Sequence, residues 1–163
     1  MMPAWCRIAE LESAGFTIQC YRHQDDPVDA DVETALADLQ QMPRVRLVDE
    51  ELDSAAFQSC LASSDVVLLP YAPGVYGGGS SGLFAAAMAG GHAAMHSAMP
   101  WSTREVLAHG LARAIATDFD DPTAVAAASV AALAASRLAP DNSEMAYAAW
   151  HSPSRLLDQL LAL

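Results

Sequence analysis

One stretch, residues 65–96, constrains the fold of this chain more than any other. It reads as an apolar strand (Val66–Leu69), a loop with four glycines, a helix that begins at residues 80–82, and a strand at 93–95. This order predicts a βαβ unit. Glycines let a ligand approach the main chain, and a helix start carries unpartnered N–H groups and roughly half a positive charge. The stretch therefore predicts a loop suited to phosphate.

The loop alone does not identify a nucleotide site. Serine is a good N-cap and glycine permits turns, so many helices begin in this way without binding anything. The loop contains neither G-x-x-x-x-G-K-[ST] nor a G-x-G-x-x-G followed by an acidic residue about 20 positions later. The spacing is compatible with a phosphate site and with a plain helix start.

The rest of the chain alternates short apolar strands with amphipathic helices. The expected strands are 16–21, Val45–Val48, Val66–Leu69, 93–95 and 111–116. The expected helices are 4–14, 32–41, Ser54–Ala62, one from 80–82, 103–109, 121–138, 143–151 and one from 152 onward. This alternation predicts a Rossmann-like, doubly wound parallel sheet of about five strands with helices on both faces, in one domain over 1–163. Ligands of such sheets bind beyond the carboxyl ends of the strands.

Composition limits the partners. The chain has 20 acidic residues and eight basic ones, all arginine, for a formal net charge of −12. This charge argues against nucleic acid or an anionic membrane surface as the main partner. A phosphate would have to be bound locally, through backbone amides or a placed arginine.

The cysteines and the hydropathy of the sequence bear on the cellular compartment of the protein. Three widely spaced cysteines without a C-x-x-C pair predict buried free thiols in a reducing environment. The sequence shows no signal peptide and no apolar run long enough for a transmembrane helix. We expect a cytoplasmic protein with no transmembrane segment and no metal site.

Several motifs, in order, carry a family resemblance. They are Ser64-Asp65-Val66-Val67-Leu68-Leu69-Pro70-Tyr71, Tyr76, Ser80-Ser81-Gly82-Leu83-Phe84-Ala85, Ala89-Gly90-Gly91, Trp101 and Trp150-His151-Ser152-Pro153. Together they resemble the carboxyl-terminal, donor-binding domain of GT-B glycosyltransferases, in particular the family-4-like retaining enzymes. The resemblance covers roughly residues 16–163.

The resemblance implies a function and a site. The chain would bind a nucleotide-sugar for transfer of a hexose-type group to an unknown acceptor, with no metal or cofactor. In that family, the helix that begins at the Ser-Gly motif offers backbone amides to the donor diphosphate. The implied diphosphate-binding residues are Gly79, Ser80, Ser81, Gly82 and Leu83, and the implied donor-pocket lining is Tyr71, Tyr76 and Gly78. No catalytic residue is assigned.

The chain also departs from the family pattern. Two glutamates of the family correspond here to Gly78 and Ala86, and the second normally binds the nucleotide ribose. The resemblance further implies that the first strand of the domain and the whole acceptor domain are missing, so the isolated chain is expected to be inactive unless another polypeptide completes it. A sheet without that central strand would expose two unpaired edges, which favours instability or a homodimer.

Two alternatives stay open. A degenerate Rossmann-like domain that acts as a non-catalytic binding or structural subunit would also explain the loss at Ala86. A flavodoxin-like or receiver-like regulator fits the alternation of strands and helices, but not the glycine loop with its Ser-Gly motif. Binding of a nucleoside diphosphate separates the glycosyltransferase from both alternatives.

Overall fold

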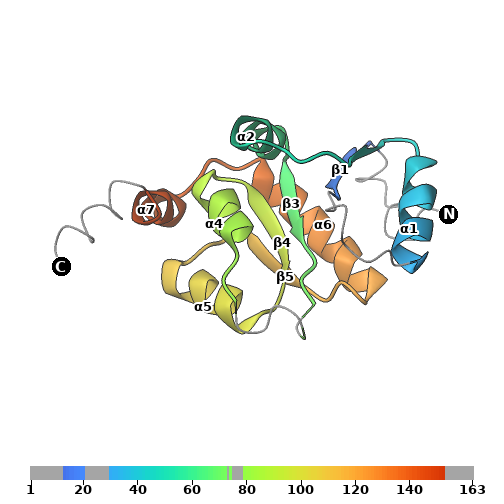
Figure 1. Cartoon of the computed structure of the whole chain (residues 1–163). Helices are drawn as coiled ribbons and strands as arrows, with labels where there is room; N and C mark the ends of the chain where they lie inside the picture. Colours follow the sequence, from blue (N-terminus) through green and yellow to red (C-terminus); the bar gives the residue numbers. More distant parts are fainter. Residues whose placement is uncertain (1–12, 21–29, 73, 75–78, 153–163) are drawn as a thin grey trace. The chain divides into compact units, whose positions relative to one another are not determined.

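The computed structural model describes residues 13–20, 30–72, 74 and 79–152. Parallel strands alternate with helices along the chain, as expected (Figure 1). The chain divides into two compact units, Met1–Phe57 and Gln58–Leu163. The helices expected at 4–14 and from 152 onward lie almost wholly outside the described residues. The single domain over 1–163 stays a prediction.

The described residues of the first unit form two strands and, between them, one helix. Strand β1 (Phe16–Gln19) pairs in parallel with β2 (Val45–Val48), and helix α1 (Ala30–Gln40) packs against β2. The amide of Cys20 donates to the carbonyl of Val48 at 2.9 Å, so the backbone pairing continues one residue beyond the strand. Helix α2 (Ser54–Ala62) follows and contains the boundary between the units.

The second unit is built on a three-stranded parallel sheet in the order β3-β4-β5. Its strands are β3 (Val66–Leu69), β4 (Ala93–Ser97) and β5 (Ala114–Thr117). Parallel neighbours require crossover connections, and the chain between the strands supplies helices α4 (Gly82–Ala89) and α5 (Pro100–His109). Helices α6 (Pro122–Ser136) and α7 (Asn142–Trp150) follow β5.

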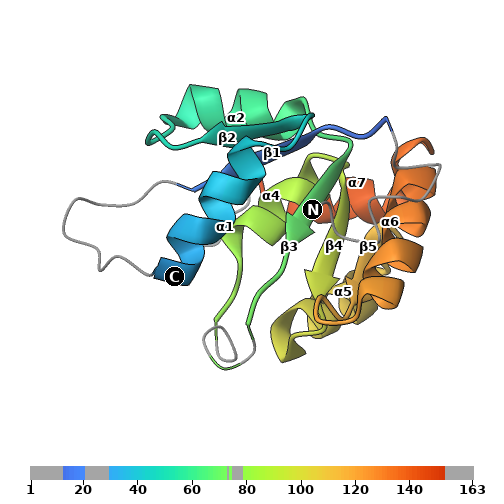
Figure 2. The ribbon, with the colours of Figure 1, turned by 90° about the vertical axis from the view of Figure 1, so that its right-hand side faces the viewer.

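Helices cover both faces of this sheet. Helix α6 packs against β3, β4 and β5, while α4 packs against β4 and α7. Figures 1 and 2 show α4 and α6 on opposite faces of the sheet. All of β4 except its last residue is therefore buried, as expected for a central strand of a parallel sheet.

The expected single sheet of five strands is wrong. The strands form two sheets, β1-β2 and β3-β4-β5. Within the described chain, β1 pairs only with β2, and β3 pairs only with β4, so each of them is an edge strand.

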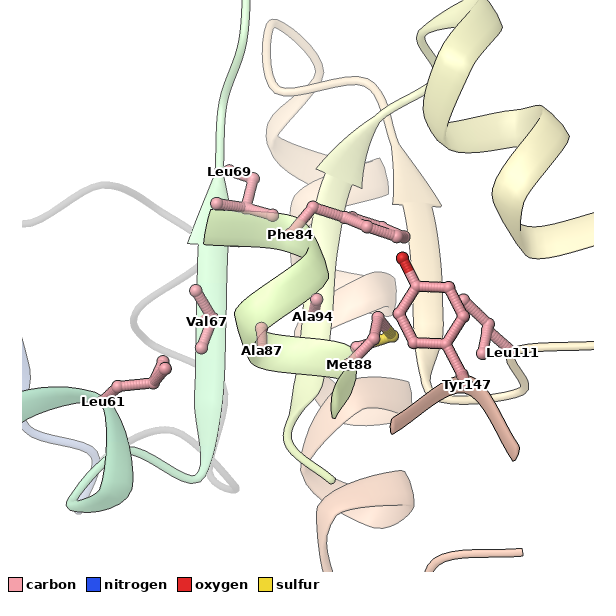
Figure 3. Packing of buried hydrophobic residues seen from close by; sticks show 9 residues of the cluster. All are labelled: Leu61, Val67, Leu69, Phe84, Ala87, Met88, Ala94, Leu111 and Tyr147. Atoms are coloured by element: carbon pink, nitrogen blue, oxygen red, sulfur yellow. The ribbon is translucent and has the colours of Figure 1, made fainter. Parts of the chain in front are cut away.

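The hydrophobic core of the second unit lies between the sheet and helices α4 and α7. Figure 3 shows nine of its side chains, with Phe84 and Met88 from α4 close to Tyr147 from α7. Phe84 is only 1% exposed and Tyr147 is completely buried. The full set is Leu61, Val67, Leu69, Phe84, Ala87, Met88, Ala94, Leu111 and Tyr147.

Several element boundaries differ from those expected, and two of them, the starts of α5 and β5, differ by three residues. Helix α5 begins at Pro100 rather than at 103, because proline is well tolerated in a first helical turn, where its missing N–H is not needed. Strand β5 begins at Ala114 rather than at 111, because the amide of Ala114 donates to the carbonyl of Leu111 at 3.1 Å and closes a turn there.

Two other expectations concern the cysteines and the membrane. Cys20 and Cys60 are free thiols, but both are half-buried rather than buried, and Cys6 lies outside the described residues. Within the described part of the chain, no helix combines the length and apolar character that crossing a membrane requires.

A buried ion pair joins the start of β5 to α7. Arg113 Nε lies 3.0 Å from Glu144 Oε2, and both side chains are almost completely buried. The guanidinium also donates to the carbonyls of Gly91 and Leu138. Glu144 Oε2 in turn accepts from the amide of Asp141 at 3.1 Å, within the capping box of α7. Arg113 thus connects the segment before β4 and the segment after α6 to helix α7.

Replacing Arg113 by methionine should lower the free energy of unfolding by about 3–5 kcal/mol, because it leaves the carboxylate of Glu144 buried without its partner. Urea unfolding followed by tryptophan fluorescence measures the change. Arg104→Met is the matched control, because Arg104 is exposed on α5. The double variant Arg113→Met/Glu144→Met should lose less than the sum of the two single variants. A cost for Arg113→Met within about 1 kcal/mol of the control would contradict this account.

Candidate functional site

The N-terminus of α4 is the first part of the candidate site. Ser81 is its N-cap, with extended backbone dihedral angles, and its hydroxyl accepts from the amide of Phe84 at 3.0 Å. Gly82 and Leu83 occupy the first two helical positions, and no partner is found for their amides among the described residues. Two N–H groups at the positive end of the helix dipole are therefore available to a ligand.

The carboxyl ends of β3 and β4 bring further side chains to this helix start. Tyr71 follows β3, and its hydroxyl lies 2.6 Å from the Ser81 hydroxyl. His96 is the penultimate residue of β4. In parallel α/β sheets this edge is the usual place for a ligand.

A small cavity lies at this edge. Its volume is about 20 Å³, enough for one water-sized group. A sugar ring or a base does not fit inside it, so a larger ligand can place only a single group there. The lining residues are Tyr71, Gly79, Ser80, Ser81, Phe84, His96, Met99, Trp101 and Ser102.

His96 is the most unusual residue of the cavity. It is only 2% exposed, and its Nδ1 lies 2.9 Å from the carbonyl oxygen of Ser97. A carbonyl oxygen only accepts hydrogen bonds, so Nδ1 carries the proton. Nε2 is buried and has no partner among the described residues. Burial lowers the pKa of His96 below its usual 6.5, and the bond to Ser97 opposes this shift only in part. The imidazole is therefore neutral at pH 7.

Phe84 holds the aromatic side of the cavity in place. Its ring meets those of His96 and Trp101 edge to face, with centroid distances of 5.4 and 5.3 Å. Because Phe84 is also a core residue of the second unit, the geometry of the cavity depends on the core packing.

The structure brings most of the predicted site residues together. Tyr71, Gly79, Ser80 and Ser81 line one cavity. Gly82 and Leu83 form the first turn of the helix whose N-cap, Ser81, is among these lining residues. Tyr76 and Gly78 lie outside the described residues. Whether any of these residues binds a ligand stays a prediction.

Sequence reasoning missed His96, Trp101 and Ser102 as cavity residues. A usable signal existed for His96: it lies two residues after Ala94 near the carboxyl end of the strand, so it shares that residue's face of the sheet. Trp101 and Ser102 were missed because the start of α5 was expected three residues later.

The first unit has a larger hollow of about 380 Å³ between α1 and its two strands. Its charged lining residues, Glu33 and Asp49, are both acidic, so the hollow is a poor place for phosphate. The remaining lining residues are Cys20, Leu36, Ala37, Gln40 and Leu47.

Comparison with family models, curated proteins and solved structures found no match to this chain. What the structure shows is a small α/β fold in which parallel strands alternate with helices.

The buried neutral imidazole predicts a pH dependence of stability. Because the folded-state pKa of His96 lies below 6.5, the unfolded chain binds more protons as the pH falls below that value. The contribution of His96 is therefore fully present above pH 6.5 and is lost as the pH falls toward the folded-state pKa, by at most about 1.4 kcal/mol per pH unit.

Urea unfolding at pH 7.5 and 5.5 measures this loss, and His96→Asn should lose less between the two pH values than the parent protein does. The comparison cancels the titration of the other groups, since both proteins contain them. Among the described residues that line the cavity, none is acidic and could stabilise a protonated His96. Equal losses in both proteins would contradict the assignment.

Proposed function

We propose that the Gln58–Leu163 unit binds the diphosphate of a nucleotide-sugar at the N-terminus of α4, as the donor-binding part of a glycosyltransferase. The observation that carries the proposal is the pairing of two helix-start amides without a partner among the described residues, on Gly82 and Leu83, with a cavity lined by His96, whose Nε2 is buried and unpartnered. Both features suit a ligand with several polar groups.

The helix start supports a phosphate rather than another ligand. Its amides and the helix dipole favour negative charge. Gly79 has no side chain to block the approach, and Ser80 is exposed with a hydroxyl that can donate. A diphosphate held in this way has its charge stabilised during glycosyl transfer without a metal ion.

No arginine is among the described residues that line the cavity. Arg113 is occupied by Glu144 and by two carbonyl groups, and the chain contains no lysine. With a net charge of −12, the general field of the protein opposes an anion. We therefore expect affinity for a nucleoside diphosphate of roughly micromolar to low millimolar Kd.

The choice of a nucleotide-sugar over other phosphorylated ligands rests on the ordered motifs that resemble the GT-B donor domain. The small cavity is compatible with it, because a nucleotide-sugar can lie over the exposed Gly79 and Ser80 while one group enters the cavity. The acceptor and the sugar are not specified by these residues.

One observation favours a second candidate, a non-catalytic binding or structural subunit. Ala86, at the position of the family's ribose-binding glutamate, is a half-buried residue packed against the hydrophobic core. The ribose therefore lacks its usual acidic acceptor. A folded chain that gives no heat with millimolar UDP or GDP would support this candidate over the first.

Replacing Gly82 by proline should weaken UDP or GDP binding about ten- to hundredfold. The substitution removes one N–H from the site, and a hydrogen bond to a charged group is worth about 1.5–3 kcal/mol. Proline suits the first helical position, and the extended backbone of Ser81 suits a residue before proline, so the helix should be retained. Isothermal titration calorimetry measures the affinity.

Gly82→Ala is the matched control. A Cβ at Gly82 would meet no atom within 4 Å, so alanine adds a side chain but keeps the N–H. It should bind within about twofold of the parent protein, well inside 1 kcal/mol. If the proline and alanine variants bind equally well, the amide of Gly82 does not hold the diphosphate.

A further inference from the structure

We propose that His96 makes this site selective for a ligand that places a hydrogen-bond donor in the cavity, an inference that rests on the proposed function of the neighbouring helix start. The ligand group is an O–H that donates to Nε2. It comes either from a hydroxyl of the transferred sugar or from a protonated terminal phosphate.

The tautomer of His96 sets this requirement. Nδ1 donates to the Ser97 carbonyl at 2.9 Å, so the neutral ring has a lone pair and no proton on Nε2. His96 lines the cavity, and because Nδ1 is bonded to Ser97, Nε2 is the ring nitrogen left to accept from a ligand. A negatively charged oxygen placed there would meet a lone pair, whereas an O–H would form a hydrogen bond.

The neighbouring groups do not satisfy Nε2. The Ser102 hydroxyl donates toward the carbonyls of Ser97 and Met99, at 3.3 and 3.2 Å. The hydroxyls of Tyr71 and Ser81 bond to each other. Of the buried polar side-chain atoms that lack a partner in the described chain, His96 Nε2 is the one that belongs to a residue lining the cavity.

The energetic reason for selectivity is the cost of an unsatisfied buried acceptor. A ligand without a donor leaves Nε2 desolvated, whereas a ligand with one forms a hydrogen bond in a water-poor environment. Sites built around such a group reject analogues that lack the matching partner strongly. The cavity of about 20 Å³ admits one such group and no more.

Two variants of His96 test the roles of its two ring nitrogens separately. Asparagine places an amide nitrogen near the position of Nδ1 and can keep the bond to Ser97, but it has no atom at the position of Nε2. Glutamine places its amide group near the position of Nε2 and restores an acceptor. The Ser97 carbonyl also accepts from the Met99 amide at 2.7 Å, so it remains satisfied in both variants.

The test is isothermal titration calorimetry of the full chain with UDP, GDP, UDP-glucose and GDP-mannose at pH 6.5 and 8.0. His96→Asn should weaken the best-binding probe at least about tenfold, and His96→Gln should recover part of the loss. If a sugar hydroxyl is the donor, the nucleotide-sugar binds more tightly than its nucleoside diphosphate at both pH values, and asparagine removes the preference.

If the terminal phosphate is the donor, the affinity for the nucleoside diphosphate falls as the pH rises above about 6, where that phosphate loses its last proton. The nucleotide-sugars lack this ionisation and show no such fall. Asparagine at position 96 should then abolish the pH dependence. Both patterns support the proposal and identify the source of the O–H.

Two results overturn the proposal. One is equal affinity of the parent protein and His96→Asn for every probe that binds, which would leave the diphosphate site intact but remove the role of His96. The other is a nitrogen NMR spectrum of the free protein that shows the proton of His96 on Nε2. If no probe binds the folded parent protein, the proposed function fails, and this inference fails with it.

Discussion

The burial of β4 on both faces is the constraint on which the rest of the second unit depends. Met95 faces α6, where the Ser129 hydroxyl lies 3.6 Å from its sulfur, and its neighbour His96 faces α4, where it meets Phe84. Side chains of adjacent strand residues point to opposite faces, so a strand covered by two helices must bury both. The packing that stabilises the sheet therefore also places an imidazole beside the start of α4.

Local patterns predicted many of the elements well. Val45–Val48, Ser54–Ala62 and Val66–Leu69 were predicted with their observed bounds, and α4 begins after Ser81 as expected. Such segments depend on neighbouring residues: apolar runs, capping side chains and breaks. The pairing of strands depends on distant residues, and periodicity carries no information about which strands lie side by side. The single five-stranded sheet was for that reason the expectation that was wrong.

The residues of the candidate site also divide into those that local sequence patterns predict and those that depend on packing with distant residues. Ser80 and Ser81 could be predicted, because glycine and serine mark the start of a helix in the sequence, whereas Tyr71 was named only through the family resemblance. His96 could be placed on a face of its strand, but its burial could not, since that depends on Phe84 from α4 and on Trp101 from α5. The cavity is formed by α4, β4, α5 and the segment after β3, and its size depends on how they pack.

The charge of the chain explains why a site of this kind would use neutral groups. Arg113, the buried arginine of the described chain, pairs with Glu144 and donates to two carbonyls, so its charge stabilises the contact between the start of β5 and α7. Backbone amides attract phosphate without adding a side-chain charge. A neutral histidine then adds selectivity rather than affinity. The free-energy cost of leaving its buried acceptor unsatisfied by a wrong ligand is larger than the net gain from a hydrogen bond to the right one. In an acidic protein, selectivity of this kind can be gained without opposing the overall field.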